Sequence, residues 1–395
     1  MDNTQSKQFP KELDELKDAL AKGNIPDSAA KIKEELDLLE RTTLNIAITG
    51  LSGAGKSSLV NALRGMTDYE ERSAKTGVTE TTKHPMGYPH PVFPNVTIWD
   101  LPGIGTSMFK VEKYLKQVGF DNYDFFIIVA SDRFTVHDSR LAHEIKKLNK
   151  KIYYVRTKLD VSLNSEARKP NFNEMQTLKR IREYYCGNLE KAGESSPRVF
   201  LISRWDLSKY DFPLLLQTLE SELEGIKKEV LIMAMPTFSK ESIRKKQQTM
   251  ESLIWKVSLL SCAVGLTPVP GLSLACDIAI LVKTMKDMYK VFGLDDDSLR
   301  MLAHHVGKPF DELHSAIKNI PSGGEITIQF VRDSLKKSLL WGTLTVVELA
   351  LDFVPIVGSV FGGASSLAST YCILKSFLRD VVKDAENVRA KAFER

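Results

Sequence analysis

The sequence has few cysteines and little excess charge of either sign, and both shortages exclude classes of protein. Only four cysteines occur among 395 residues, and no two of them form a C-x-x-C pair. Because a chain of this length needs no disulfide staples, we expect reduced thiols and a cytoplasmic protein. Lys and Arg number 54 against 50 Asp and Glu, a net charge of +4. We therefore expect no nucleic acid partner, since a nucleic-acid binder carries a strongly basic domain.

Other absences narrow the field further. The seven histidines show no zinc-ligand spacing, and the first ten residues contain no apolar run typical of a secretory signal. The chain contains 23 glycines and 16 prolines, which are ordinary numbers for its length. Its hydrophobic fraction of 43% is too high for a disordered chain. The length predicts two or three domains with substantial cores.

Strand-like and helical patterns alternate in the first half of the chain. Residues 10–41 predict two helices separated by Gly23–Pro26, with Asp27 or Ser28 as the cap of the second. Apolar runs of strand length then alternate with helical stretches, at Leu44–Thr49, Val96–Trp99, Phe125–Ala130, Ile152–Val155 and Val199–Ile202. Strands separated by helices predict a mainly parallel α/β sheet.

The C-terminal part is mostly helical and contains two stretches without charge. Val257–Cys276 and Phe353–Leu374 are each long enough to span a bilayer, but Pro and Gly interrupt both. We favour two apolar helical hairpins that continue into the charged helices Lys283–Lys290 and Lys375–Arg389. An integral-membrane protein anchored through these stretches is the alternative.

The strongest motif lies directly after the first predicted strand. Residues 50–57 match the phosphate-loop pattern G-x-x-x-x-G-K-[ST] and open a helical pattern. Lys56 is expected to reach the β- and γ-phosphates, and the Ser57 hydroxyl to ligate Mg²⁺. The glycines and the helix N-terminus supply backbone N–H groups and partial positive charge. The predicted nucleotide contacts from this loop are Gly50, Ser52, Gly53, Ala54, Gly55, Lys56, Ser57 and Ser58.

Two further motifs follow two further strands. Asp100-Leu101-Pro102-Gly103 would supply a second Mg²⁺ contact from Asp100 and a γ-phosphate contact from the Gly103 N–H. Thr157-Lys158-Leu159-Asp160 is a guanine-recognising pattern, since Asp160 accepts from the ring N1–H and the exocyclic amine. The Lys158 stem would lie over the base.

The last predicted strand leads to Ser203-Arg204-Trp205. GTPases usually have a small Ser-Ala-Lys-like turn here, with a backbone N–H on the guanine carbonyl. Ser203 fits that turn, whereas Arg204 and Trp205 depart from it. We include Ser203 and Arg204 among the predicted nucleotide contacts.

Together these segments resemble the interferon-inducible, immunity-related GTPases. The resemblance also rests on Ala74–Val78, Trp99, Tyr123–Phe126, Tyr154–Arg156, Tyr210–Pro213 and Phe292–Asp295. It implies a Ras-like G domain with a mostly parallel six-stranded sheet, set in an all-α domain built from both chain ends. The implied boundaries are 1–41, 42–225 and 226–395.

The resemblance also implies the activity and the partners. These are Mg²⁺-dependent GTP hydrolysis to GDP, self-association of G domains with GTP bound, and association with other family members. It further implies peripheral action at intracellular membranes in cell-autonomous defence. Family members carry Lys or Met in the phosphate loop, and Lys56 indicates the hydrolysing type.

The group that would orient the attacking water is missing from its usual place. Small GTPases have a Gln just after the D-x-x-G turn, where this chain has Ile104 and Gly105. We expect residues 76–82 to form switch I, with Thr76 or Thr82 on Mg²⁺ or the γ-phosphate and Gly77 near the nucleotide. Glu80 is a candidate catalytic helper, with an uninvolved solvated loop as the alternative. A non-catalytic, membrane-associated adaptor with a GTP pocket is the alternative function.

Overall fold

The computed structural model describes residues 25–77, 82–104, 111–132, 135–237, 239–265, 272–321, 325–341 and 361–393. The chain divides into two compact units. A sheet unit comprises Thr42–Ser242 and Arg300–Phe310, and a helical unit comprises Met1–Arg41, Ile243–Leu299 and Asp311–Arg395. The predicted domain boundary at residue 225 remains a prediction, and the sheet unit continues past it.

The sheet unit is built on six strands in the order β2-β3-β1-β4-β5-β6. All neighbouring pairs are parallel except β2 with β3. The strands are β1 (Leu44–Gly50), β2 (Met86–Pro89), β3 (Val96–Asp100), β4 (Phe125–Ala130), β5 (Lys151–Arg156) and β6 (Val199–Leu201). The predicted parallel sheet is confirmed, with strand ends displaced by one residue at most.

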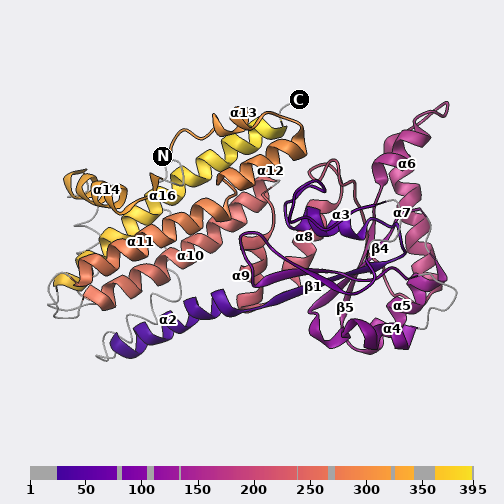
Figure 1. The fold of residues 1–395 in the computed structure, drawn as a ribbon, viewed down its shortest axis with the longest axis horizontal. Coiled ribbons are helices and arrows are strands. Elements are labelled where there is room, and N and C mark those ends of the chain that lie inside the picture. The colour runs from indigo at the N-terminus through magenta and orange to yellow at the C-terminus, as the bar shows by residue number, and fades with distance from the viewer. Residues whose placement is uncertain are drawn as a thin grey trace, which may run out of the picture. The chain divides into compact units, whose positions relative to one another are not determined.

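Helices pack on the sheet, and those before β6 lie in the connections between its strands (Figure 1). They are α3 (Lys56–Leu63), α4 (Val111–Val118), α5 (Val136–Lys147), α6 (Leu159–Glu166), α7 (Glu174–Lys191), α8 (Phe212–Ser221) and α9 (Gly225–Ala234), with a short 3₁₀ turn, η1 (Phe120–Asn122). Every residue of β4 is buried, as expected for a central parallel strand covered on both faces. The Phe126 ring stacks on Phe120 at 4.5 Å.

The register of the sheet brings the predicted motifs to one edge. Ile48 pairs with Asp100, and Gly50 pairs with Val129, so β1, β3 and β4 end together. Val129 also pairs with Val155 near the end of β5. Ligands of open α/β sheets bind outside these carboxyl ends, so the fold places three motifs where a ligand can meet all of them.

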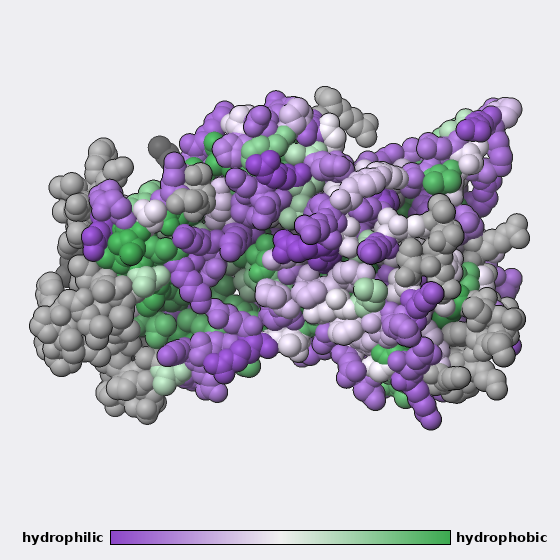
Figure 2. All heavy atoms as spheres, in the orientation of Figure 1, coloured by the Kyte–Doolittle hydropathy of each residue, from purple (hydrophilic) through white to green (hydrophobic). Residues whose placement is uncertain are grey.

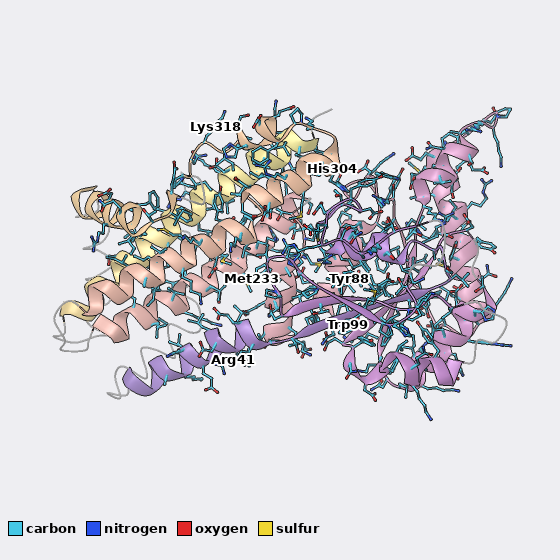
Figure 3. The ribbon with its side chains drawn as sticks, in the orientation of Figure 1. Arg41, Tyr88, Trp99, Met233, His304 and Lys318 are labelled. Carbon is cyan, nitrogen blue, oxygen red and sulfur yellow. The ribbon has the colours of Figure 1, made fainter. Side chains whose placement is uncertain are left out.

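The antiparallel edge strand β2 was absent from the sequence interpretation. Its four residues, Met-Gly-Tyr-Pro, are exposed or half-buried and lack an apolar run, so no hydrophobic pattern marks them. Tyr88 pairs with Ile98, and the neighbouring Trp99 donates its indole N–H to Asn45 Oδ1 at 2.9 Å (Figure 3). Pro89 is tolerated because edge strands leave one side of the backbone unpaired.

The helical unit joins segments from both ends of the chain. Its main helices are α2 (Ile25–Arg41), α10 (Lys240–Gly265), α11 (Leu272–Val291), α13 (Phe310–His314), α14 (Ile328–Trp341) and α16 (Phe361–Phe393), whereas α12 (Asp296–Val306) begins in this unit and continues into the Arg300–Phe310 segment of the sheet unit. Glu35 on α2 pairs with Lys256 on α10 at 3.4 Å. Ser261 on α10 shares a hydrogen bond of 3.0 Å with Thr370 on α16. The predicted all-α domain built from N- and C-terminal segments is confirmed.

The predicted cap of the second N-terminal helix is wrong. Helix α2 begins at Ile25, before Asp27 and Ser28, and includes Pro26 in its first turn. Proline is tolerated there because the first N–H groups of a helix have no intrahelical partner. The first predicted helix lies outside the described residues.

The two uncharged stretches are only partly described. Residues 257–265 end α10, residues 272–276 begin α11, and residues 361–374 begin α16. The turns of the predicted hairpins lie outside the described residues, whereas the charged continuations are helical as predicted. Among the helices that the structure describes, none combines the length and apolarity needed to cross a membrane. Hydrophobic side chains of the helical unit show between polar ones on the face in Figure 2.

Candidate functional site

The phosphate-loop motif forms a tight turn between β1 and α3. Gly53 and Gly55 have φ of 75° and 89°, in the left-handed region where glycine is favoured. A Cβ on Gly50 would lie 2.1 Å from the carbonyl oxygen of Val129, so only glycine fits at the strand end. Gly55 is the N-cap of α3 and supplies no side-chain cap, leaving the first N–H groups of the helix open to a ligand.

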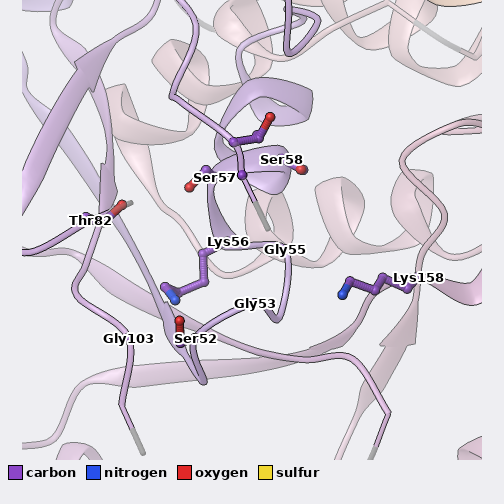
Figure 4. A pocket seen from close by; sticks show the side chains of 11 residues that line it. Ser52, Gly53, Gly55, Lys56, Ser57, Ser58, Thr82, Gly103 and Lys158 are labelled. Atoms are coloured by element: carbon purple, nitrogen blue, oxygen red, sulfur yellow. The ribbon is translucent and has the colours of Figure 1, made fainter. Parts of the chain in front are cut away.

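A polar cavity of about 140 Å³ lies over this turn (Figure 4). Thr82 and Gly103 border it on one side and Lys158 on the other. Lys56 is buried, and its Nζ donates to the Leu51 carbonyl at 3.0 Å. The full lining is Ser52, Gly53, Gly55, Lys56, Ser57, Ser58, Thr76, Gly77, Thr82, Gly103 and Lys158.

Asp100 receives two hydroxyl groups on one carboxylate oxygen. Ser57 Oγ donates to Asp100 Oδ2 at 2.6 Å, and Thr82 Oγ1 donates to the same oxygen at 2.9 Å. Burial raises the pKa of Asp100, while the hydrogen bonds from Ser57 and Thr82 and the charge of Lys56 oppose the rise. Two of the predicted Mg²⁺ ligands, Ser57 and Thr82, are therefore both bonded to the third, Asp100.

These three residues fit a magnesium ion. Asp100 is completely buried, and its other oxygen, Oδ1, is without a hydrogen-bond partner in the described part of the chain. An orphaned buried carboxylate oxygen is costly unless a ligand satisfies it. Mg²⁺ prefers oxygen ligands and is usually held by one or two carboxylates together with substrate phosphates. Ser57, Thr82 and Asp100 would hold the ion, which would neutralise charge on a bound triphosphate.

The turn after Asp100 packs directly on the phosphate loop. A Cβ on Gly103 would lie 3.0 Å from both the N and the Cα of Ser52. Tyr114 on α4 donates to the Pro102 carbonyl at 3.1 Å and shares a hydrogen bond of 2.8 Å with Thr49. Ile104 donates its N–H to the Gly50 carbonyl at 3.1 Å, and its side chain is buried. The turn is thereby fixed against β1, and Ile104 points into the core.

The guanine-recognising motif is joined to the phosphate loop by a hydroxyl. Thr157 Oγ1 donates to the Ala54 carbonyl at 2.5 Å and lies 3.2 Å from the Ala130 carbonyl. Lys158 adopts φ of 53° as the N-cap of α6. Asp160 Oδ1 accepts a hydrogen bond of 3.0 Å from Ser203 Oγ, which fixes the carboxylate from the neighbouring loop.

A second, more apolar cavity of about 390 Å³ adjoins the first. The two cavities share Gly55, Ser58 and Lys158, so a ligand can extend from one into the other. A polar end over a phosphate loop and an apolar end beside Asp160 match the two ends of a nucleotide. The lining of the second cavity is Gly55, Ser58, Leu59, Ala62, Asp132, Thr157, Lys158, Asp160, Val161, Ile202, Arg204 and Trp205.

The structure places most of the predicted residues together. Thr76 and Gly77 line the first cavity while remaining exposed, and Asp160 and Arg204 line the second. Three predicted residues line neither cavity. Gly50 ends β1, Ala54 accepts the Thr157 hydrogen bond, and Ser203 donates to Asp160. Glu80 lies outside the described residues.

Some residues of the site carried no motif. Asp68, in the loop after α3, pairs with Arg204 and accepts from Asn61 Nδ2 at 2.8 Å. Tyr114 likewise lies on a helix with no recognisable pattern. Trp205 could have been found, because it occupies the second position after Ser203 in a turn already assigned to the base.

Comparison with known proteins supports one family. The model of the family "Interferon-inducible GTPase (IIGP)" matches residues 9–391. Interferon-inducible GTPase 5 of Rattus norvegicus is 40% identical over 385 residues, covering 97% of this chain and 83% of the relative. Interferon-inducible GTPase 1 of Mus musculus is 36% identical over 302 residues, covering 76% of this chain and 73% of the relative.

A solved structure of Toc33 from Arabidopsis thaliana overlaps with 50% of this chain and 81% of its own length. Its TM-score is 0.33 at 14% identity, too low to support a conclusion. The sequence matches, in contrast, extend over nearly the whole chain, and the motifs they imply meet at one edge of the sheet. The chain belongs to the interferon-inducible GTPase family.

Proposed function

We propose that this GTPase binds GTP with Mg²⁺ across the two adjoining cavities and hydrolyses it to GDP and phosphate. The observation that carries the proposal is that the phosphate loop and Asp160 line two cavities that share Gly55, Ser58 and Lys158, with Asp100 bonded to Ser57 of the first cavity. Lys56 would contact the β- and γ-phosphates, and the Gly103 N–H the γ-phosphate. Asp160 would select guanine over adenine.

Hydrolysis requires a group that orients water. The residue after the D-x-x-G turn is the buried Ile104, which has no polar side chain to offer. We infer that this chain is of the Lys-containing, hydrolysing type but turns over slowly alone. Self-association of G domains in the GTP state would raise the rate, with Glu80 as the candidate helper.

The place of action is also part of the proposal. Both related proteins are named interferon-inducible GTPases. We propose that this chain acts peripherally at intracellular membranes in cell-autonomous defence, through its helical unit. Association with other family members belongs to the same proposal.

One titration tests both hydrolysis and self-association. GTP turnover per molecule is measured over a wide range of protein concentration, with and without liposomes. A rate that rises with concentration, and rises further on liposomes, supports the proposal. GTP binding without turnover at any concentration would favour the non-catalytic adaptor. A turnover rate that is the same in Glu80→Ala as in wild type, and independent of protein concentration, would remove both Glu80 and the self-association step.

A further inference from the structure

Trp205 is a large aromatic residue at the edge of the apolar cavity. It lines that cavity together with Lys158 and Asp160, and 57% of its surface is exposed. Burying an indole normally contributes to stability, so a ring left open beside a cavity leaves apolar area for a ligand. The turn that contains it departs from the usual sequence of a base-binding loop, and the proposed function has not assigned the ring a task.

The Ser203 hydroxyl links the backbone of Trp205 to Asp160. Its backbone N–H donates to Ser203 Oγ at 3.3 Å, and the same hydroxyl donates to Asp160 Oδ1 at 3.0 Å. The backbone of Trp205 is therefore linked, through one hydroxyl, to the carboxylate that would bind the guanine edge. A purine held by Asp160 would lie beside this ring.

The guanidinium of Arg204 lies over one face of the Trp205 ring. The guanidinium carbon lies 4.1 Å from the centroid of the Trp205 ring, within the range of a cation–π contact. Arg204 is itself paired with Asp68, whose carboxylate also accepts from Asn61 at 2.8 Å and from Ser58 at 3.2 Å. With one face covered by a fixed guanidinium, the ring has its second face left for a planar ligand.

From this arrangement we propose that Trp205 is the second wall of the base site, with the purine held between its indole and the aliphatic stem of Lys158. Arg204 is a positioning residue that acts through the ring and through Asp68. This inference rests on the proposed function and adds to it the residue that stacks on the base. Stacking is tolerant of base identity, so Trp205 contributes affinity and Asp160 contributes selectivity.

The test uses GDP and ADP as probes, with affinities measured by titration calorimetry on the full chain. Trp205→Leu is expected to weaken GDP binding by about 5- to 150-fold, the range for loss of one base–aromatic stack. ADP binding should weaken by a similar factor, so the GDP-to-ADP ratio stays near that of wild type. Trp205→Phe keeps an aromatic face and should lose less than about fivefold.

Tryptophan fluorescence gives a second readout. GDP should quench the wild-type emission, and this quench should vanish in Trp205→Phe and Trp205→Leu. Trp255→Phe is the matched control, because Trp255 lies in the helical unit with its ring centroid 4.4 Å from that of Tyr371, and it should retain the quench. Arg204→Met and Asp68→Asn should each weaken GDP binding, and the double variant should lose less than the two losses added together.

The outcomes separate this inference from the proposed function. Trp205→Leu that binds GDP as wild type does, with the quench kept, overturns the inference alone. Unchanged GDP affinity with an altered dependence of turnover on protein concentration also overturns it, since the ring would then contact a second copy. Wild type that does not bind GDP overturns both.

Discussion

Ser57 donates its hydroxyl hydrogen bond to Asp100 at 2.6 Å, across the gap between the phosphate loop and the end of β3. Thr82 donates to the same carboxylate oxygen, so three predicted metal ligands are already assembled. Replacing Asp100 by Asn removes the negative charge without changing the shape of the side chain. We expect Asp100→Asn to lose the tightening of GTP binding by Mg²⁺, measured as the ratio of affinities with Mg²⁺ and with a chelator. A ratio like that of wild type would contradict the assignment.

The same carboxylate predicts a pH dependence. Burial raises the pKa of Asp100, and Mg²⁺ requires the ionised form. As pH falls through this raised pKa, protons compete with the metal, so Mg²⁺ affinity should decline at a higher pH than for an ordinary carboxyl. Titration of Mg²⁺ at successively lower pH checks this, because the decline should begin above the range in which an ordinary Asp, near 4, titrates. In Asp100→Asn, this part of the slope should be absent.

Asp160 predicts which base is bound. Asn at this position has an oxygen that accepts from the ring N1–H and an amide N–H₂ that donates, which suits the 2-carbonyl of xanthine but not the 2-amine of guanine. Asp160→Asn should lower GTP affinity by at least about 100-fold and should bind xanthosine triphosphate in preference. Competition between the two nucleotides measures this. Asp121→Asn, an exposed carboxylate on η1, is the control and should keep the preference for GTP. An unchanged preference in Asp160→Asn would remove Asp160 from the base site.

Gly103 lies where the D-x-x-G turn approaches the backbone of the phosphate loop. A Cβ there would lie 3.0 Å from the backbone of Ser52, closer than such atoms normally approach, so the loop must shift. Gly103→Ala should therefore weaken GTP binding by about tenfold or more, since a 1.4 kcal/mol effect is tenfold in affinity. Gly187→Ala is the matched control, because a Cβ at Gly187 meets nothing within 4 Å in helix α7. That control should bind normally and gain about 0.5–1 kcal/mol of stability from helix propensity. Equal GTP affinities in the two variants would contradict the close packing.

Lys246 predicts a pH-dependent stability in the helical unit. It is 3% exposed, its Nζ donates to the Val291 carbonyl at 2.6 Å, and burial lowers its pKa to about 7. In the unfolded chain the Lys246 amine keeps its proton up to about pH 10, whereas in the folded chain burial disfavours the protonated form. The free energy of unfolding is therefore highest above about pH 10 and falls as the pH falls toward 7. Lys246→Met should be more stable than wild type at neutral pH, by on the order of 2–4 kcal/mol, with a gap that narrows toward pH 10.

Chemical denaturation of both proteins from pH 7 to 10 measures that gap. The exposed Lys240→Met, on the same helix, is the control and should show no such trend. A Lys246→Met protein that is less stable at every pH would mean that the bond to Val291 outweighs the burial of the charge.

Much of the nucleotide site was predictable because each of its motifs lies directly after a strand. The apolar runs fix where β1, β3 and β5 end, and parallel strands bring Ser57, Asp100 and Asp160 to one edge. Strand β2 was not predictable, since its pairing depends on the neighbouring strand rather than on its own apolar pattern.

Contacts made between loops were also beyond sequence reasoning. The pairing of Asp68 with Arg204 joins residues 136 positions apart from two irregular segments, and no spacing rule relates them. Burial of Lys246 was equally hidden, because a lysine in a charged run normally indicates a solvated helix face. The start of α2 differs from the prediction because Pro26, which as a residue type favours a helix break, lies in the first turn of the helix.

The central claim is that the phosphate loop and the guanine-recognising loop form one GTP-hydrolysing site. Its most direct test is phosphate release from GTP and from ATP by wild type and Lys56→Ala, with Mg²⁺ and at high protein concentration. Lys116→Ala, an exposed lysine on α4, is the control. We expect wild type and Lys116→Ala to release phosphate from GTP but not from ATP, and Lys56→Ala to lose this release. Equal release by Lys56→Ala, or no release from GTP by wild type, would contradict it.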